Sequence, residues 1–125
     1  MLCLSSCAPN SLEDYQKEGD ALCRKLVKEF QQVHSREELV KVMPHLKKEF
    51  ENLVDLVVEA RVYQANHPED GSLYEGLQSE ALRAELQRIY ALEGGRVLIE
   101  EAQHEALLRL DVFEKNFTRQ LLKGK

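Results

Sequence analysis

Few residues in this 125-residue sequence have the types and spacing that chemistry requires. Glu101 and His104 form an E-x-x-H pair, and residues three apart on a helix point in the same direction. Two such pairs and two further carboxylates build the dinuclear metal sites of helical bundles. Only one E-x-x-H occurs here, and it lies off the main apolar stripe around it. We therefore expect no metal site and keep Glu101 and His104 as weak candidates.

Two further histidines precede a glutamate by four residues: His34 precedes Glu38, and His45 precedes Glu49. On a helix this spacing brings the two side chains together across one turn. A metal site would need such a pair to converge with another His–Glu pair. Exposed pairs of this kind contribute only a few tenths of a kcal/mol to stability. The simpler interpretation is that both pairs lie on a solvated surface.

The motifs of common enzyme classes are absent from the sequence. It contains no P-loop, no G-x-G-x-x-G, no G-x-S-x-G and no H-E-x-x-H. The serines fall near the N-terminus, at expected helix caps or near loops, where no base accompanies them. Cys23 suits a small, half-buried helix position better than a reactive nucleophile. We predict no catalytic residues, no cofactor and no enzymatic activity.

Composition and charge exclude other classes of protein. The formal net charge is −5, and no basic block suited to nucleic acid occurs. Hydrophobic residues make up 43% and charged residues 31% of the chain, which suits one packed core. No apolar stretch is long enough to cross a bilayer.

The first ten residues differ from the rest of the chain. They are small or apolar, carry no charged side chain and end at Pro9-Asn10. Within them, Leu4-Ser5-Ser6-Cys7 resembles the lipobox of bacterial lipoproteins, in which an aliphatic residue and two small residues precede the lipidated cysteine. The resemblance implies that Cys7 carries a diacylglycerol thioether and becomes the new N-terminus after cleavage.

A lipid on Cys7 would tether the protein to a membrane of the bacterial cell envelope, on the periplasmic side. Residues 1–10 would then be a residual leader and a flexible tether. A complete leader has a basic segment and a longer apolar stretch, whereas six residues without Lys or Arg precede Cys7 here. The resemblance thus implies coding sequence upstream of Met1. A cytoplasmic protein without an anchor is the other interpretation.

The elements that follow are helical. Ser11 and Ser35 each begin a capping-box pattern, and an apolar stripe with steps of three or four residues follows each serine. Pro44 interrupts the second stripe, so this helix must kink there or restart. A dense run of turn formers, Asn66 to Ser72, ends it.

A third helical region begins near Ser72 or Ser79 and reaches Gly94-Gly95, after which the longest apolar stripe follows. Two adjacent glycines predict a turn, because glycine adopts left-handed backbone geometry without steric cost. A single bent helix through the pair stays open, since the apolar residues on both sides remain roughly in phase. We predict an all-α fold, an antiparallel bundle of three to four helices, as one domain over residues 11–125.

Six residues on the longest stripes are expected to pack together in the core: Phe50, Leu53, Val57, Leu110, Phe113 and Phe117.

The function that the sequence as a whole favours is a non-enzymatic, lipid-anchored cell-envelope protein that acts through protein–protein interaction with an unidentified partner. A cytosolic helical adaptor or chaperone-like module is the alternative, and a metal- or small-ligand-binding bundle is a third, weaker hypothesis.

Overall fold

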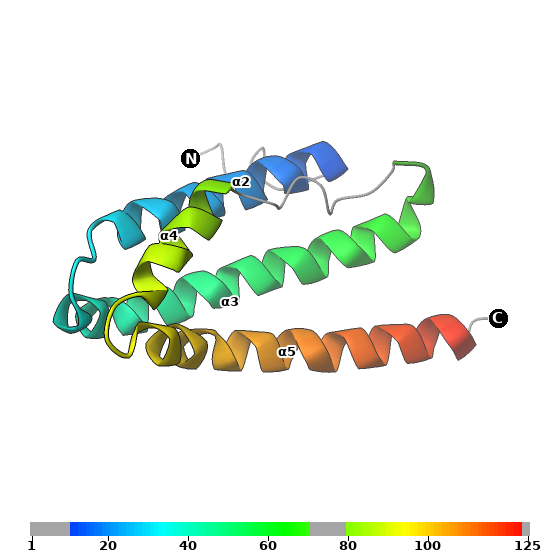
Figure 1. The fold of residues 1–125 in the computed structure, drawn as a ribbon. Helices are drawn as coiled ribbons and strands as arrows, with labels where there is room; N and C mark the ends of the chain where they lie inside the picture. Colours follow the sequence, from blue (N-terminus) through cyan, green and yellow to red (C-terminus); the bar gives the residue numbers. More distant parts are fainter. Residues whose placement is uncertain (1–10, 71–79, 124–125) are drawn as a thin grey trace, which may run out of the picture.

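The chain folds into helices throughout the part that its structure, a computed structural model, describes: residues 11–70 and 80–123. The elements are α2 (Leu12–Gln31), α3 (Arg36–Asn66), the short 3-10 helix η1 (Pro68–Asp70), α4 (Glu80–Tyr90) and α5 (Gly95–Lys123) (Figure 1). The described residues include no strand. The predicted all-α bundle is confirmed. The expected starts at Ser72 or Ser79 lie outside the described residues.

Two serine caps begin the first long helices, as predicted. The hydroxyl of Ser11 accepts a hydrogen bond from the backbone N–H of Asp14 at 3.1 Å. That of Ser35 accepts one from the N–H of Glu38 at 3.2 Å, and the Glu38 carboxylate in turn accepts one from the N–H of His34. These contacts satisfy backbone donors that the first helical turn leaves without partners. Local sequence therefore sets where α2 and α3 begin.

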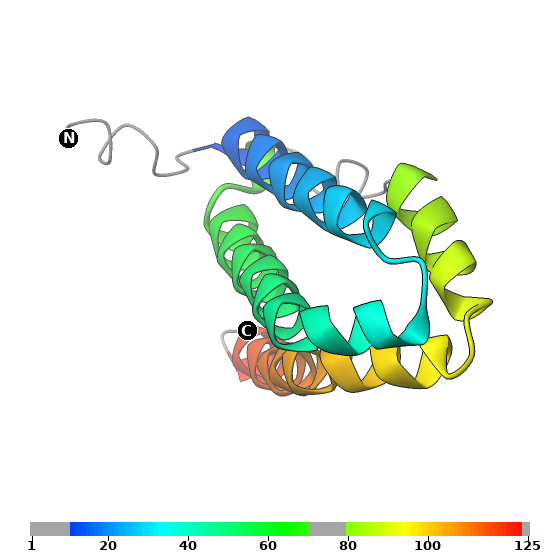
Figure 2. The same ribbon diagram turned by 90° about the vertical axis from the view of Figure 1, so that its left-hand side faces the viewer.

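Pro44 lies inside α3 and does not end it. The proline cannot donate a hydrogen bond to the carbonyl of Val40, which lies on an exposed turn where water can reach it. Figure 2 shows the consequence: the teal first turns of α3 run in a different direction from its green remainder. Helix α3 therefore kinks at Pro44 and does not break into two helices.

Residues 91–94 separate α4 from α5, and Gly95 is the first residue of α5. Gly94 has φ of +70°, and the N–H of Gly95 donates to the carbonyl of Leu92 at 2.9 Å. The predicted turn is confirmed, and the single long helix through the glycines is excluded. Because the chain turns here, Ile89 and Ile99 both reach the core and are fully buried.

Helix α3 is the central element, with α2 packed on one side and α5 on the other, while α4 contacts α2 and α5 near one end (Figures 1 and 2). Arg88 joins α4 to the C-terminal end of α2, because its guanidinium donates hydrogen bonds to the backbone carbonyls of Phe30 and Val33. The main core draws on all four helices; its fully buried members include Leu26, Phe30, Leu39, Leu46, Ile89 and Ile99.

The expected core residues are only partly confirmed. Phe50 is buried, but Leu53, Val57, Leu110, Phe113 and Phe117 are half-buried. The two phenylalanine rings of α5 stack on each other with centroids 5.1 Å apart, and the guanidinium of Arg61 lies 5.6 Å from the Phe117 ring. They lie where only α3 covers α5, so one helix rather than two or three shields them.

Candidate functional site

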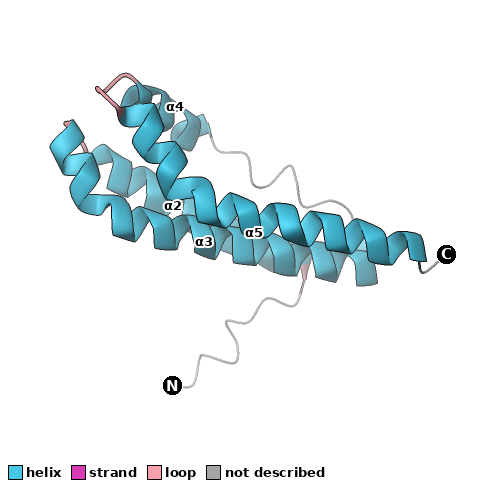
Figure 3. Cartoon of the chain, turned by 90° about the horizontal axis from the view of Figure 1, so that it is seen from below, coloured by secondary structure: helices cyan, strands magenta, loops and turns pink. Residues whose placement is uncertain are grey.

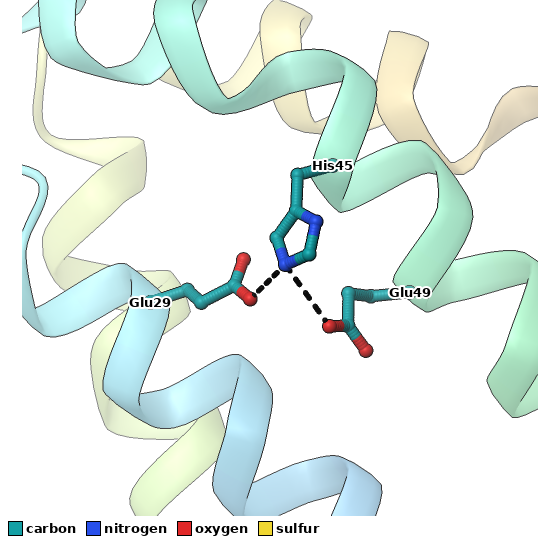
Figure 4. Close-up of side chains that lie close together, drawn as sticks. All are labelled: Glu29, His45 and Glu49. Atoms are coloured by element: carbon teal, nitrogen blue, oxygen red, sulfur yellow. Dashed lines mark ion pairs between the residues drawn. The ribbon is translucent and has the colours of Figure 1, made fainter.

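A cluster of three side chains joins α2 to α3 where the two helices cross. Glu29 comes from α2, whereas His45 and Glu49 lie one turn apart on α3, directly after the Pro44 bend (Figure 4). The Nε2 atom of His45 contacts Oε2 of Glu29 and lies 3.2 Å from Oε2 of Glu49. One atom of each residue lies within 4.8 Å of the other two, so the three donors converge on one point.

Burial in this cluster is uneven. The Glu49 side chain is 2% exposed and that of Glu29 21%, whereas His45 is 56% exposed and forms the outer edge. The ammonium group of Lys25 lies 3.5 Å from Oε2 of Glu49. The second oxygen of each carboxylate, Oε1 of Glu29 and Oε1 of Glu49, is buried without a hydrogen-bond partner. Two acceptors in the site are therefore unsatisfied.

Burial raises the pKa of the Glu29 carboxyl above its ordinary value. The nearby His45 partly offsets this rise in pKa, and the charge of the Glu49 carboxylate adds to it. Two carboxylates this close repel each other in a partly desolvated place, so a positive charge between them is favoured. The cluster thus places two acidic groups and one imidazole together in a partly desolvated space.

The expectation for His45 and Glu49 was wrong in one respect. They do form the predicted pair across a turn, but Glu49 is among the most buried residues and is not on the surface. Glu29 completes the site from another helix, and sequence reasoning missed it. The one available signal was its place between Leu26 and Phe30 of the apolar stripe, which puts a carboxylate beside the core.

The other residues that the sequence analysis considered for a functional role lie away from this cluster or outside the described residues. Glu101 and His104 are both exposed on α5 and take no part in this cluster. Cys7 and the residues before it lie outside the described residues. Cys23 is a buried free thiol whose pKa is raised, first by burial and then by the charge of Asp20. A raised pKa keeps the thiol protonated and makes it a poor nucleophile.

A second feature with functional potential is a row of exposed apolar side chains on α5. Val97, Leu108, Val112 and Leu122 are 66%, 48%, 56% and 69% exposed. At 3.6 residues per turn, the directions of these four side chains fall within about 80° of one another, so they share one side of the helix. We call these four residues the outer stripe. It lies opposite Ile99 and Ala106, which face the core.

Nothing among the described helices covers the outer stripe. Helix α5 packs along α3 and touches α4 only near its own beginning. Seen from below in Figure 3, α5 lies in front of α3, and Figure 1 shows that the C-terminal end of α5 extends beyond α2. Leu107 is also exposed, at 52%, but it lies about 100° around the helix from Leu108 and about 140° from Val112, so it points away from the central pair of the stripe.

No protein-family model, curated protein sequence or solved structure matches this chain. Within the described residues, none of the helices combines the length and apolar character that crossing a membrane requires. What the chain does is therefore inferred from its own residues.

Proposed function

We propose that this chain is a non-enzymatic, lipid-anchored protein of the bacterial cell envelope that acts through protein–protein interaction, with the outer stripe of α5 as its contact surface. The lipid on Cys7 sets where the protein acts, and the helical bundle presents the stripe. The single observation that carries the proposal is the exposure of Val97, Leu108, Val112 and Leu122 on one side of the last helix.

An exposed apolar row is costly to leave in water, because apolar surface is stabilised by about 25 cal/mol for each Å² that becomes buried. Single exposed apolar side chains are ordinary, whereas several aligned on an uncovered helix are typical of an interaction surface. Val97 and Leu122 are separated by about 38 Å along the helix axis. This length suits another helix lying side by side with α5.

The order of charges along the stripe favours a second copy of this chain as the partner. Glu101 and Glu105 accompany the stripe in its first half, and Lys115 and Arg119 do so in its second half; all four are exposed. Two α5 helices side by side in opposite directions would therefore place acidic residues of one against basic residues of the other. Such complementarity orients partners and suppresses wrong pairings.

The spacing of the stripe supports the same antiparallel pairing. Residues 108 and 112, 105 and 115, and 101 and 119 are each placed symmetrically about residue 110. A twofold axis at that point would bring Leu108 against Val112 of the partner copy. A twofold dimer uses the same patch on both subunits and needs this kind of self-complementarity.

Sedimentation equilibrium of the purified chain tests the interaction. We expect a reversible monomer–dimer equilibrium, which Leu108→Glu shifts to monomer by placing a carboxylate in the apolar contact. Leu107→Glu is the matched control: the leucine is equally exposed but faces another direction, so this variant should still dimerise. A wild type that stays monomeric near millimolar concentration, or equal effects of the two variants, would overturn the proposal.

Exchanging the charges of Glu101 and Arg119 tests the antiparallel arrangement of the proposed dimer. Glu101→Arg alone should weaken the dimer because it places like charges opposite each other. Adding Arg119→Glu in the same chain should restore the dimer, since each copy then offers the reversed pair. Failure of the second substitution to restore association would exclude the antiparallel arrangement.

Labelling with palmitate tests the anchor. The complete natural gene, expressed in a bacterium, should incorporate the label, and Cys7→Ala should abolish incorporation. Cys3→Ala is the matched control, because Met1 and Leu2 precede Cys3 in place of the two small residues that precede a lipidated cysteine. Label that persists in Cys7→Ala, or none in the wild type, would favour the unanchored adaptor instead.

A further inference from the structure

We propose that Glu29, His45 and Glu49 form a binding site for a first-row divalent cation of the zinc type, bridging α2 and α3. The three residues supply one imidazole nitrogen and two carboxylate oxygens, all within 4.8 Å of one another. Imidazole and carboxylate are donors that suit such ions. The site is independent of the outer stripe, because it lies on other helices.

The separation of His45 and Glu49 fits an ion held by these donors, and the closer contact between His45 and Glu29 would open when the ion enters. Ligand atoms about 2.0 Å from a tetrahedral zinc ion lie about 3.3 Å from one another. Nε2 of His45 lies 3.2 Å from Oε2 of Glu49. Because His45 is 56% exposed, the fourth position would face water. Three protein ligands with an open fourth position are the arrangement that holds a metal-bound water.

The unsatisfied oxygens point to a ligand. The Glu49 side chain is 2% exposed, yet its Oε1 has no hydrogen-bond partner, and Oε1 of Glu29 is in the same state. Native proteins satisfy almost all buried polar atoms, so each exception calls for a cause. The single Nε2 of His45 is shared between two carboxylates and cannot satisfy four oxygens. An ion that binds one carboxylate through both oxygens would use the unsatisfied oxygen of that carboxylate, and its open position would then be the fifth.

Lys25 is the competing cation in this arrangement. Its ammonium group lies 3.5 Å from Oε2 of Glu49, and its side chain is 60% exposed on a flexible stem. It can therefore swing into water when an ion binds. Removing its charge should strengthen binding of the ion, because a positive charge beside the site repels a cation. Lys25→Gln thus has a predicted effect opposite to that of removing a ligand.

Calorimetric titration with Zn²⁺ tests the site. The protein is the full chain carrying Cys3→Ser and Cys7→Ser, since thiolates also bind zinc. We expect one equivalent of Zn²⁺ to bind and to raise the melting temperature, because the ion joins two helices. His45→Gln and Glu49→Gln should each weaken binding at least about tenfold. Co²⁺ in place of Zn²⁺ should give visible absorption bands that His45→Gln removes.

Two matched controls separate this site from ordinary surface histidines. His34→Gln removes a histidine with the same spacing to a glutamate, and His104→Gln removes that of the E-x-x-H pair; neither should change binding. His45→Gln alters a half-exposed side chain and should fold normally by circular dichroism, so it stays informative even if Glu49→Gln unfolds. No saturable binding by the wild type, or undiminished affinity in His45→Gln, would mean that the cluster is an ion-pair network only.

Discussion

Replacing Gly94, which precedes α5, or Gly95, which begins it, should destabilise the fold, and the structure gives each substitution its own cost. Gly94 has φ of +70°, in the left-handed region where a Cβ costs about 1–2 kcal/mol. The Cβ of Gly94→Ala would meet only the flexible side chain of Arg36, at 3.2 Å from Nε. Backbone geometry alone therefore sets the cost of this variant.

Gly95→Ala should cost more. The added Cβ would overlap the carbonyl oxygen of Ile89, a backbone atom that cannot move as a side chain does. That oxygen also accepts a hydrogen bond from the N–H of Leu92 at 3.0 Å, so moving it disturbs the turn itself. We expect a loss of about 2–3 kcal/mol, above the cost of a left-handed residue, because the native backbone cannot accept the side chain.

Thermal and chemical unfolding followed by circular dichroism measure these costs. Each kcal/mol should lower the melting temperature by about 4 °C in a domain of this size. Gly94→Asn should lie between the wild type and Gly94→Ala, because asparagine tolerates the left-handed region better than alanine. In a continuous helix, by contrast, each alanine would stabilise by up to about 1 kcal/mol. A higher melting temperature for the double alanine variant would therefore refute the turn.

Three further predictions follow from other contacts. Arg88→Ala should lower the free energy of unfolding by about 1–3 kcal/mol in a urea titration, because it leaves two backbone carbonyls at the end of α2 without their donor. An unchanged free energy of unfolding would mean that water replaces the guanidinium. Phe113→Ala should cost about 2 kcal/mol in the same assay, roughly half of the loss at a fully buried position; a loss of 4 kcal/mol or more would contradict its half-exposure. The hydrogen bond from the Tyr63 hydroxyl to Asp70 raises the pKa of Tyr63 to about 12, which ultraviolet titration should detect and Asp70→Asn should reverse. Since the fold raises this pKa, the contribution to stability is complete below about pH 10 and is lost as pH rises through about 12; an unchanged midpoint in Asp70→Asn would refute the assignment.

The sequence by itself determined the helices and their ends. A serine hydroxyl that caps a helix acts on a backbone N–H three residues away, so Ser11 and Ser35 show in sequence what they do in the fold. The turn before α5 is equally local, because Gly94 adopts a left-handed backbone conformation that glycine reaches without steric cost. Periodic apolar residues then gave the class, an all-α bundle.

Tertiary structure decided which helix faces are covered. Periodicity showed that Phe113 and Phe117 share a face with Ile99, but not that α3 alone would cover the far end of α5. The outer stripe was missed for the same reason. In the sequence its four residues are apolar interruptions of a charged helix face, and only the packing shows that no described helix covers them. How much of an amphipathic helix is buried depends on the neighbours that reach it, and their paths are set by turns far away in sequence.

The Glu29–His45–Glu49 cluster is the clearest case of a site that only the tertiary structure assembled. The spacing of His45 and Glu49 is readable from sequence, and so is their placement one turn apart. The burial of Glu49 and the approach of Glu29 are not, because they depend on where α2 crosses the bent α3. Glu29 and Glu49 meet only where α2 and α3 cross, and the sequence of one helix cannot encode that meeting.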